Sequence, residues 1–160
     1  MRTFAKITVM TVIALALFTV CKSTPKFSDV TGKEWLLVEI QTEPRNIEFD
    51  RTNLKSDGFG NIFTLNFDAE RLSGVGAPNR YTAPYKVDKN QVISVQLIAG
   101  TMMAPIREPE KLKEQDYFTY LQNTYKWNFN KKTGLMELNS KNADGKEAVL
   151  IYKLGTTEKK

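Results

Sequence analysis

The segment "LSGVGAPNRYTAPY" (72–85) concentrates residues that restrict or free the backbone. Gly74 and Gly76 allow backbone angles that a side chain would forbid, whereas prolines on either side fix the angles next to them. Asn79 can hydrogen-bond its neighbouring backbone, and Arg80 carries a planar fork of N–H donors that can tie carbonyls or a carboxylate. These residues predict a rigid, well-braced corner between strands, with a ligand-contacting surface as the alternative role.

Two tyrosines follow on the strand that leaves this corner. Tyr81 and Tyr85 are four residues apart, so they lie on the same face of a strand. Pro84 stands between them and indicates an edge position or a bulge, because proline donates no hydrogen bond to a β-ladder. In "NIFTLNFD" (61–68), on the other side of the corner, apolar and polar residues alternate, which predicts another strand.

The same alternation continues over most of the chain and predicts an antiparallel sheet. The predicted strands lie within residues 30–40, 61–68, 70–76, 81–87, 91–100, 124–130, 135–140 and 148–154. The periodicity changes after Pro105. Pro109, the acids Glu108 and Glu110 of an expected first turn, and apolar residues at helical spacing predict one helix of about four turns. The fold class is therefore α+β, a curved antiparallel sheet or partly closed barrel of seven or eight strands with one inserted α-helix.

The N-terminal residues have the pattern of an export signal. Two basic residues precede the run "ITVMTVIALALFTV" (7–20), which is short for a membrane-spanning helix, so residues 1–20 predict a signal peptide, with an uncleaved anchor as the alternative. The only cysteine, Cys21, follows at once and resembles the lipidated cysteine of bacterial lipoproteins, although Phe18 and Val20 depart from the usual lipobox. We expect lipidation of Cys21, a tether over 21–28, a domain over 29–154 and a flexible tail over 155–160.

The corner and its surroundings resemble the signature of the META domain, the HslJ-like family of bacterial envelope proteins. In that family a "GxxGCNRYxGxY"-type segment is followed by a "TxMA" segment; the corresponding residues here are "SGVGAPNRYTAPYKV" (73–87) and "AGTMMAP" (99–105). A Trp-bearing first strand, a later helix and a final strand pair also occur in the family order. The resemblance covers residues 29–153. It implies an envelope-associated protein, often a lipoprotein, with a role in envelope stress or maintenance and no catalytic residues to transfer.

The chain departs from this family in the longer segment "NIEFDRTNLKSDGFG" (46–60) and at the positions of two cysteines. Many members have cysteines that can pair across the corner, where this chain has Ala77-Pro78 and Ala104-Pro105. The added prolines restrain the unfolded chain by another means. The fold implied by the resemblance is also similar to that of a lipoprotein pilot that binds a secretin tail and lipid, which makes a pilotin-like periplasmic or secreted binding protein the alternative function.

Composition removes several classes of function. The chain has no histidine and no cysteine after position 21, so a Ser-His triad, a disulfide and a thiolate metal site are excluded, and we expect no metal and no cofactor. Removal of residues 1–20 lowers the net charge from +5 to about +3, with acids interleaved, so we expect no nucleic-acid binding. A hydrolase using the acids of 108–116 is the enzymatic alternative, but these acids are better explained as the exposed face of the helix.

The sequence thus predicts a non-enzymatic lipoprotein, anchored through Cys21 to the periplasmic face of the outer membrane, that binds an envelope protein or an apolar ligand. Methionine and tyrosine suit adaptable contacts. For Met102 and Met103, the alternative role is to fill the core. The candidate binding or structural residues are Gly74, Gly76, Asn79, Arg80, Tyr81, Tyr85, Met102 and Met103.

Overall fold

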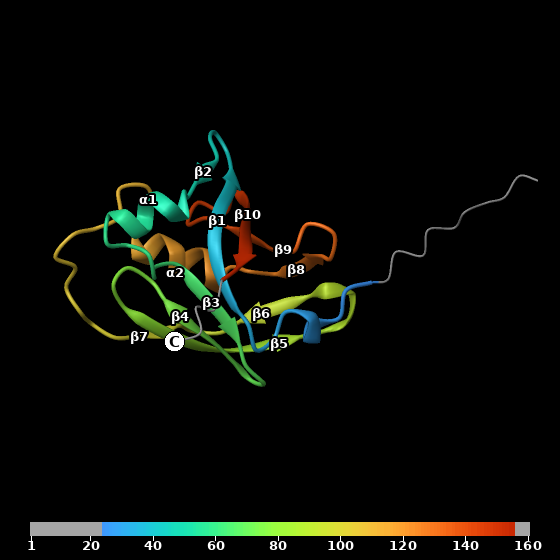
Figure 1. Ribbon diagram of the computed structural model, residues 1–160. Coiled ribbons are helices and arrows are strands. Elements are labelled where there is room, and N and C mark those ends of the chain that lie inside the picture. The colour runs from blue at the N-terminus through green and yellow to red at the C-terminus, as the bar shows by residue number, and fades with distance from the viewer. Residues whose placement is uncertain (1–23, 156–160) are drawn as a thin grey trace, which may run out of the picture.

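The computed structural model describes residues 24–155 of the 160-residue chain (Figure 1). The predicted signal peptide, the predicted lipid attachment at Cys21 and the predicted tail beyond Gly155 lie outside the described residues. No helix between residues 24 and 155 is long and apolar enough to cross a membrane.

A single curved antiparallel sheet forms the body of the protein, as the sequence predicts. Its neighbouring strands follow the order β6-β5-β4-β3-β1-β10-β9-β8, while β2 pairs with β1 and β7 pairs with β5. The strands are β1 (Glu34–Thr42), β2 (Ile47–Glu48), β3 (Thr64–Phe67), β4 (Arg71–Val75), β5 (Arg80–Val87), β6 (Ile93–Val95), β7 (Ala99–Gly100), β8 (Lys126–Asn130), β9 (Leu135–Lys141) and β10 (Glu147–Leu154).

Strands β6 and β8, which stand at the two ends of this order, contact each other, so the sheet is a nearly closed barrel. Val92 forms an isolated bridge with Lys126, and the backbone N–H of Ile93 donates to the carbonyl of Tyr125. Helix α2 (Glu114–Gln122) contacts both β6 and β9 and buries Tyr117 and Leu121 completely. The helix therefore fills the interior near the closure, and the aromatic and aliphatic inner faces of β1, β3, β4 and β10 complete the core.

The N-terminal 3₁₀-helix η1 (Phe27–Asp29) belongs to the barrel. The Phe27 ring lies 5.0 Å from Trp127, 5.2 Å from Phe67 and 5.6 Å from Tyr85, between ring centroids. Phe27 thus joins strands from both sides of the closure. Among residues 24–155, η1 is the first regular element along the chain.

The helical prediction was wrong in length and number. Helix α2 has nine residues, from Glu114, rather than the expected four turns, and Pro109 lies five residues before it. The preceding residues form neither helix nor strand and are held to another part of the chain, because Lys111 donates to the carbonyl of Glu48. A second helix, α1 (Arg51–Ser56), was not expected. Asp50 caps it by accepting from the backbone N–H groups of Thr52 and Asn53.

Two predicted strands are shorter than their alternation suggests. The strand expected over 61–68 is β3, from Thr64, because Phe63 has a positive φ of 50° that ends the ladder. The segment 91–100 divides into β6 and β7. Pro84 lies in β5 between the residues paired with β7 and those paired with β6, at a local gap in the pairing rather than on a free edge.

Candidate functional site

Asn79 is the centre of the corner (residues 74–85). Its side chain is 6% exposed and makes four hydrogen bonds. The amide nitrogen donates to the carbonyl of Met103 and to the Glu114 carboxylate, and the amide oxygen accepts from Thr101 Oγ1 and from the backbone N–H of Met103. Asn79 therefore fixes the beginning of the segment Thr101–Lys113, which we call the strap, against the corner.

Glu114 fixes the other end of the strap to the same corner. Its Oε1 accepts from the backbone N–H groups of Ala77 and Asn79, and its Oε2 accepts from Asn79 Nδ2 at 2.7 Å. Sequence reasoning placed this residue on an exposed helix face, with no signal for a partner 35 residues away. The strap consequently begins and ends at one braced point.

The two glycines of the corner are required for close approach rather than for unusual backbone angles, which corrects the sequence interpretation. Neither has a positive φ among the described glycines. A Cβ on Gly74 would lie 2.0 Å from the carbonyl oxygen of Thr64, and one on Gly76 would lie 2.5 Å from Glu114 Oε1. The missing side chains therefore let β4 approach β3 and let the Glu114 carboxylate reach the corner.

The first tyrosine of the corner is a core residue. Tyr81 Oη donates to the carbonyl of Thr64 at 2.7 Å and lies 3.2 Å from Tyr117 Oη, which in turn accepts from Tyr152 Oη at 3.3 Å. Burial raises the pKa of Tyr117 to about 12 and raises the pKa of Tyr81 and Tyr152 well above the ordinary 10.0. These hydroxyls are neutral structural donors over the physiological range.

The remaining predicted site residues do not share one environment. Tyr85 is half-buried, shares the inward face with Tyr81 and donates to the carbonyl of Asp68, so the bracing role accounts for it. Arg80 is exposed, and its guanidinium makes no hydrogen bond or ion pair within residues 24–155, contrary to the expected tie. Met102 is 99% exposed and Met103 53% exposed, so the core-filling interpretation of these methionines was wrong.

The strap exposes an apolar run beside a pocket. Its five consecutive residues from Met102 to Ile106 are apolar and exposed, and Ile106 is fully exposed. A pocket of about 580 Å³ lies next to them, which we call the apolar pocket. Its wall comprises the strap, the loop after α1 and the corner, with Phe59, Ile62, Val75, Ala77, Pro78, Met103, Ala104, Pro105 and Ile106 among its residues.

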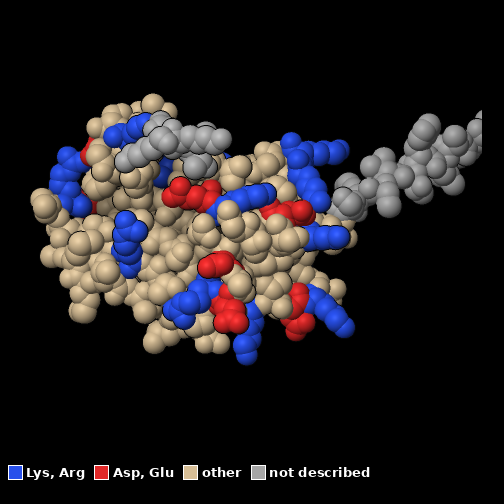
Figure 2. All heavy atoms as spheres, turned by 60° about the horizontal axis from the view of Figure 1, so that its bottom comes forward, with Lys and Arg blue, Asp and Glu red and all other residues tan. Residues whose placement is uncertain are grey.

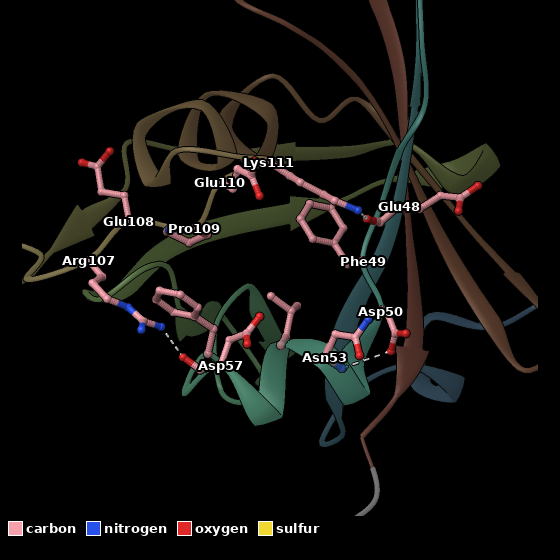
Figure 3. Close-up of a pocket in the computed structure, with 12 residues that line it drawn as sticks. Glu48, Phe49, Asp50, Asn53, Asp57, Arg107, Glu108, Pro109, Glu110 and Lys111 are labelled. Carbon is pink, nitrogen blue, oxygen red and sulfur yellow. Dashed lines mark hydrogen bonds between the residues drawn. The ribbon is translucent and has the colours of Figure 1, made fainter.

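A second pocket, of about 550 Å³, lies on the other side of Arg107 (Figure 3). We call it the acidic pocket because five carboxylate residues line it: Glu48, Asp50, Asp57, Glu108 and Glu110. Figure 3 shows Glu108 and Glu48 at opposite ends with their carboxylates directed outward, and Phe49 between them. Pro109, which is buried, contributes to the same apolar floor.

Arg107 separates the two pockets. Its guanidinium lies 5.0 Å above the centroid of the Phe59 ring and donates to the carbonyl of Asp57. These three residues line both pockets. The middle of the strap is thereby held onto the loop that follows α1.

The half-buried side chain of Arg51 hydrogen-bonds to this loop. Its guanidinium donates to the carbonyls of Gly60 and Ile62 at 2.9 and 3.0 Å, and more weakly to that of Leu37 at 3.4 Å. Burial lowers its pKa from 12.5. One side chain therefore ties α1, β1 and the loop before β3 together.

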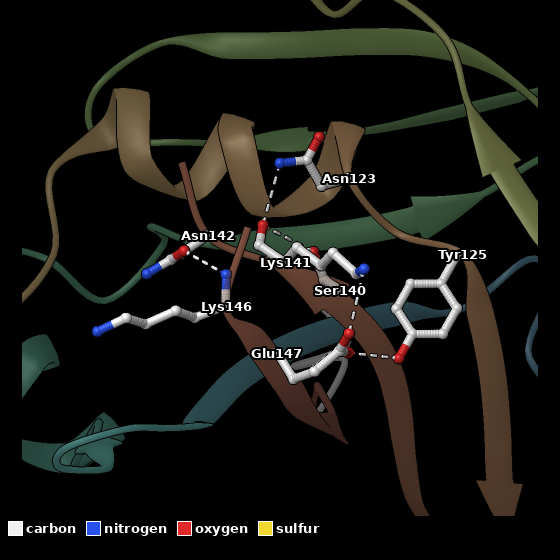
Figure 4. A network of polar contacts seen from close by, with 7 residues as sticks. All are labelled: Asn123, Tyr125, Ser140, Lys141, Asn142, Lys146 and Glu147. Carbon is white, nitrogen blue, oxygen red and sulfur yellow. Dashed lines mark hydrogen bonds and ion pairs between the residues drawn. The ribbon is translucent and has the colours of Figure 1, made fainter. Parts of the chain in front are cut away.

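Other polar features are local. In Figure 4, Glu147 accepts from Tyr125 Oη and pairs with Lys141, and these contacts lower the pKa of the Glu147 carboxyl. Tyr125 and Glu147 are exposed, and the network joins β8, β9 and β10 around the turn before Glu147. No group of three or more metal-ligating side chains occurs between residues 24 and 155. On the face in Figure 2, basic and acidic side chains are interspersed.

The family follows from a comparison of the whole folded region. Residues 28–153 match the META domain. The chain belongs to the META domain family. The described barrel and the corner with its strap are therefore the structure of a META domain, as the resemblance in residues 73–87 and 99–105 predicted.

Two solved structures are similar to this META domain. The NMR structure of a protein from Burkholderia xenovorans is 18% identical, with a TM-score of 0.59 over 81% of this chain and 86% of that one. The crystal structure of a DUF4847 family protein from Bacteroides vulgatus is 12% identical, with a TM-score of 0.53 over 82% of this chain and 98% of that one. At these identities the likeness concerns the fold alone. No curated protein matches the chain.

The positions where many META domains were expected to pair cysteines lie around one pocket here. Ala77, Pro78, Ala104 and Pro105 all line the apolar pocket. In place of a covalent bridge, this META domain joins its corner to the strap through the buried amide of Asn79. The sequence motif indicated that residues 73–87 and 99–105 lie near each other. No sequence pattern indicated that the acidic and apolar pockets lie on either side of Arg107.

Proposed function

We propose that this META domain protein is a non-enzymatic, lipid-anchored envelope protein that binds a partner through the strap. The observation that carries the proposal is the run of five exposed apolar residues from Met102 to Ile106, beside a pocket on a frame fixed by Asn79 and Glu114. Soluble proteins seldom expose contiguous apolar surface without a binding role. A rigid frame also reduces the entropy that binding removes.

The chemistry of the described residues supports binding rather than catalysis. The buried titratable cluster consists of three tyrosines whose raised pKa values keep them neutral, and their hydroxyls are engaged with one another and with the Thr64 carbonyl. The Glu114 carboxylate is occupied by three N–H groups. The chain has no histidine to act as a general base.

Lipidation at Cys21 would orient the strap away from the membrane. Six positions separate Cys21 from Phe27, so the lipid attachment would lie within about 20 Å of η1. In Figure 1 the chain enters on the right, near the β5–β6 and β8–β9 turns, and the strap lies on the opposite side, between β7 and α2. The strap of an anchored molecule is thus available to periplasmic partners or to domains of other envelope proteins, consistent with a role in envelope maintenance.

The anchor is tested by intact-mass spectrometry and membrane fractionation of the native protein beside a Cys21→Ser variant. We expect a mature mass that begins at Cys21 and includes a diacylglyceryl group, and loss of the variant from the membrane fraction. An unlipidated mass, with cleavage elsewhere or none, would contradict the anchor, while leaving binding at the strap open to its own test.

Binding at the strap is tested in cells with a photo-crosslinking amino acid in place of Met102 or Ile106. We expect a discrete protein adduct at both positions. The matched control is the same replacement at Leu97, which is 80% exposed and apolar but lies outside the strap. The absence of an adduct from the strap positions, or the same adduct from Leu97, would contradict the proposal.

A further inference from the structure

We propose that the two pockets beside the strap receive one extended segment of a partner protein, in which an apolar side chain occupies the apolar pocket and a nearby basic side chain occupies the acidic pocket. The inference rests on the proposed binding function and specifies the chemistry of the partner.

The pockets form a continuous surface. Asp57, Phe59 and Arg107 line both of them, so a chain that crosses the Arg107 and Phe59 side chains passes from one pocket to the other. Successive side chains of an extended segment point in opposite directions, and side chains two residues apart point the same way. An apolar residue and a basic residue two positions apart can therefore enter the two pockets from one segment.

The charge of the acidic pocket selects a basic side chain. Five acidic and two basic residues line this pocket, and both basic side chains are already engaged with backbone carbonyls: Arg107 with Asp57 and Lys111 with Glu48. Within residues 24–155 none of the five carboxylates forms an ion pair. This local excess of acid contrasts with the net charge of +5 of the whole chain. A cation entering the pocket supplies the missing complement.

The floor of the acidic pocket suits the stem of a long basic side chain. Phe49 is 6% exposed, and Leu54, Phe59 and Pro109 complete an apolar surface beneath the carboxylates. Lys and Arg place their methylene stems on such surfaces while the charged head stays at the polar rim. Figure 3 shows the carboxylate of Glu108 at one end of the pocket, where such a charged head can emerge.

The apolar pocket suits an aliphatic or aromatic side chain. Ile62, Val75 and Ala77 form its fixed wall, and Met103 and Ile106 form its exposed side. Methionine is flexible and polarizable, so Met103 can adapt to side chains of different shape. A bilayer is a poorer occupant, because the acidic rim would repel the anionic surface of a membrane.

The experiment selects binders from a displayed library of random heptapeptides on purified residues 22–160. We expect enriched sequences in which an apolar residue lies about two positions from Lys or Arg. Binding of a synthetic enriched peptide should weaken about tenfold or more in a Glu108→Lys/Glu110→Lys variant, and should decline with salt. The control Glu70→Lys/Asp144→Lys reverses two exposed carboxylates elsewhere and should leave binding within about twofold of the parent.

A second pair of variants tests the apolar side. Met103→Glu should abolish binding of the same peptide, and Leu97→Glu, at an exposed apolar residue away from the strap, should not. If Met103→Glu removes binding but the charge reversals do not, binding at the strap stands and the basic partner is wrong. Enriched acidic peptides, or cosedimentation with phosphatidylglycerol vesicles that Met103→Glu removes, would also overturn this inference. Peptides that bind every variant equally would contradict the proposed function as well.

Discussion

The carboxylate of Glu114 accepts hydrogen bonds from both the backbone N–H and the side-chain amide of Asn79, at 2.7 Å each. The two residues are 35 positions apart, yet this contact closes the strap into a loop with both ends at the corner. The position of the strap depends on this contact, because within residues 24–155 no other hydrogen bond joins the start of α2 to Asn79.

Replacing Glu114 with Gln should therefore destabilise the protein. The amide can supply only one acceptor oxygen and places an NH₂ group against N–H donors, so we expect a loss of about 1–3 kcal/mol in the free energy of unfolding. Urea denaturation measures this loss. The control is Gln115→Ala, an exposed position on the same helix. Equal stability of the two variants would contradict the bracing role of Glu114.

The two glycines of the corner should differ in their tolerance of alanine. Gly74→Ala meets the Thr64 carbonyl oxygen at 2.0 Å, a backbone atom that cannot move freely, and should cost about 3 kcal/mol or more. Gly76→Ala meets the end of the Glu114 side chain and should cost less. Gly100→Ala, whose nearest contact would be 3.5 Å, is the control. Thermal denaturation should rank the three in that order, and an inverted rank would be evidence against close approach as the reason for the glycines.

Alkaline conditions should unfold the protein through its tyrosine cluster. The folded-state pKa of Tyr117 is about 12 against 10.0 for the free side chain, and the pKa of Tyr81 and Tyr152 is also raised. Below pH 10 the tyrosines are protonated in both states, so the stabilisation is complete. As pH rises above 10 the unfolded state loses protons first, and stability falls through pH 12, by about 2–3 kcal/mol for Tyr117 alone.

The measurement is urea denaturation at successive pH values, beside tyrosinate absorbance. Tyr117→Phe removes the most central hydroxyl and should flatten the decline above pH 10, although it lowers stability at neutral pH. A parent protein whose stability stays constant from pH 10 to pH 12 would show that these hydroxyls ionise without cost.

Arg51 should not tolerate lysine. The guanidinium reaches the carbonyls of Gly60, Ile62 and Leu37 at once, and a single ammonium group lacks that planar fork. We expect Arg51→Lys to lower the free energy of unfolding by about 2 kcal/mol. Arg45→Lys, at an exposed position, should have almost no effect in the same denaturation assay. Similar curves for the two variants would rule out the carbonyl contacts as a source of stability.

Phe27 should contribute to the barrel although it follows the predicted tether so closely. Its ring contacts Trp127, Phe67 and Tyr85, so Phe27→Ala should cost roughly 1.5–3 kcal/mol. Tryptophan fluorescence should report the loss, since Trp127 would lose its neighbour. Lys26→Ala is the adjacent exposed control. If Phe27→Ala leaves both stability and fluorescence unchanged, the folded domain begins later in the chain.

The sequence by itself determined the family, the antiparallel barrel and the position of the corner. Strand alternation in β5, β9 and β10, and the grouping of Gly, Pro and Asn in 72–85, are local patterns that a short stretch of chain expresses on its own. The order of these elements along the chain also placed residues 73–87 and 99–105 in one family motif. These features depend on residues close together in sequence.

Only the tertiary structure decided which side chains work together. Glu114 looks like an ordinary first-turn acid until Asn79 is packed against it, and Pro109 looks like a helix start until Lys111 is drawn to Glu48. The exposure of Met103 likewise depends on where the strap crosses the loop after α1. Such contacts join residues 24 to 63 positions apart, and their energy depends on distance and burial in the folded state, which no local pattern encodes.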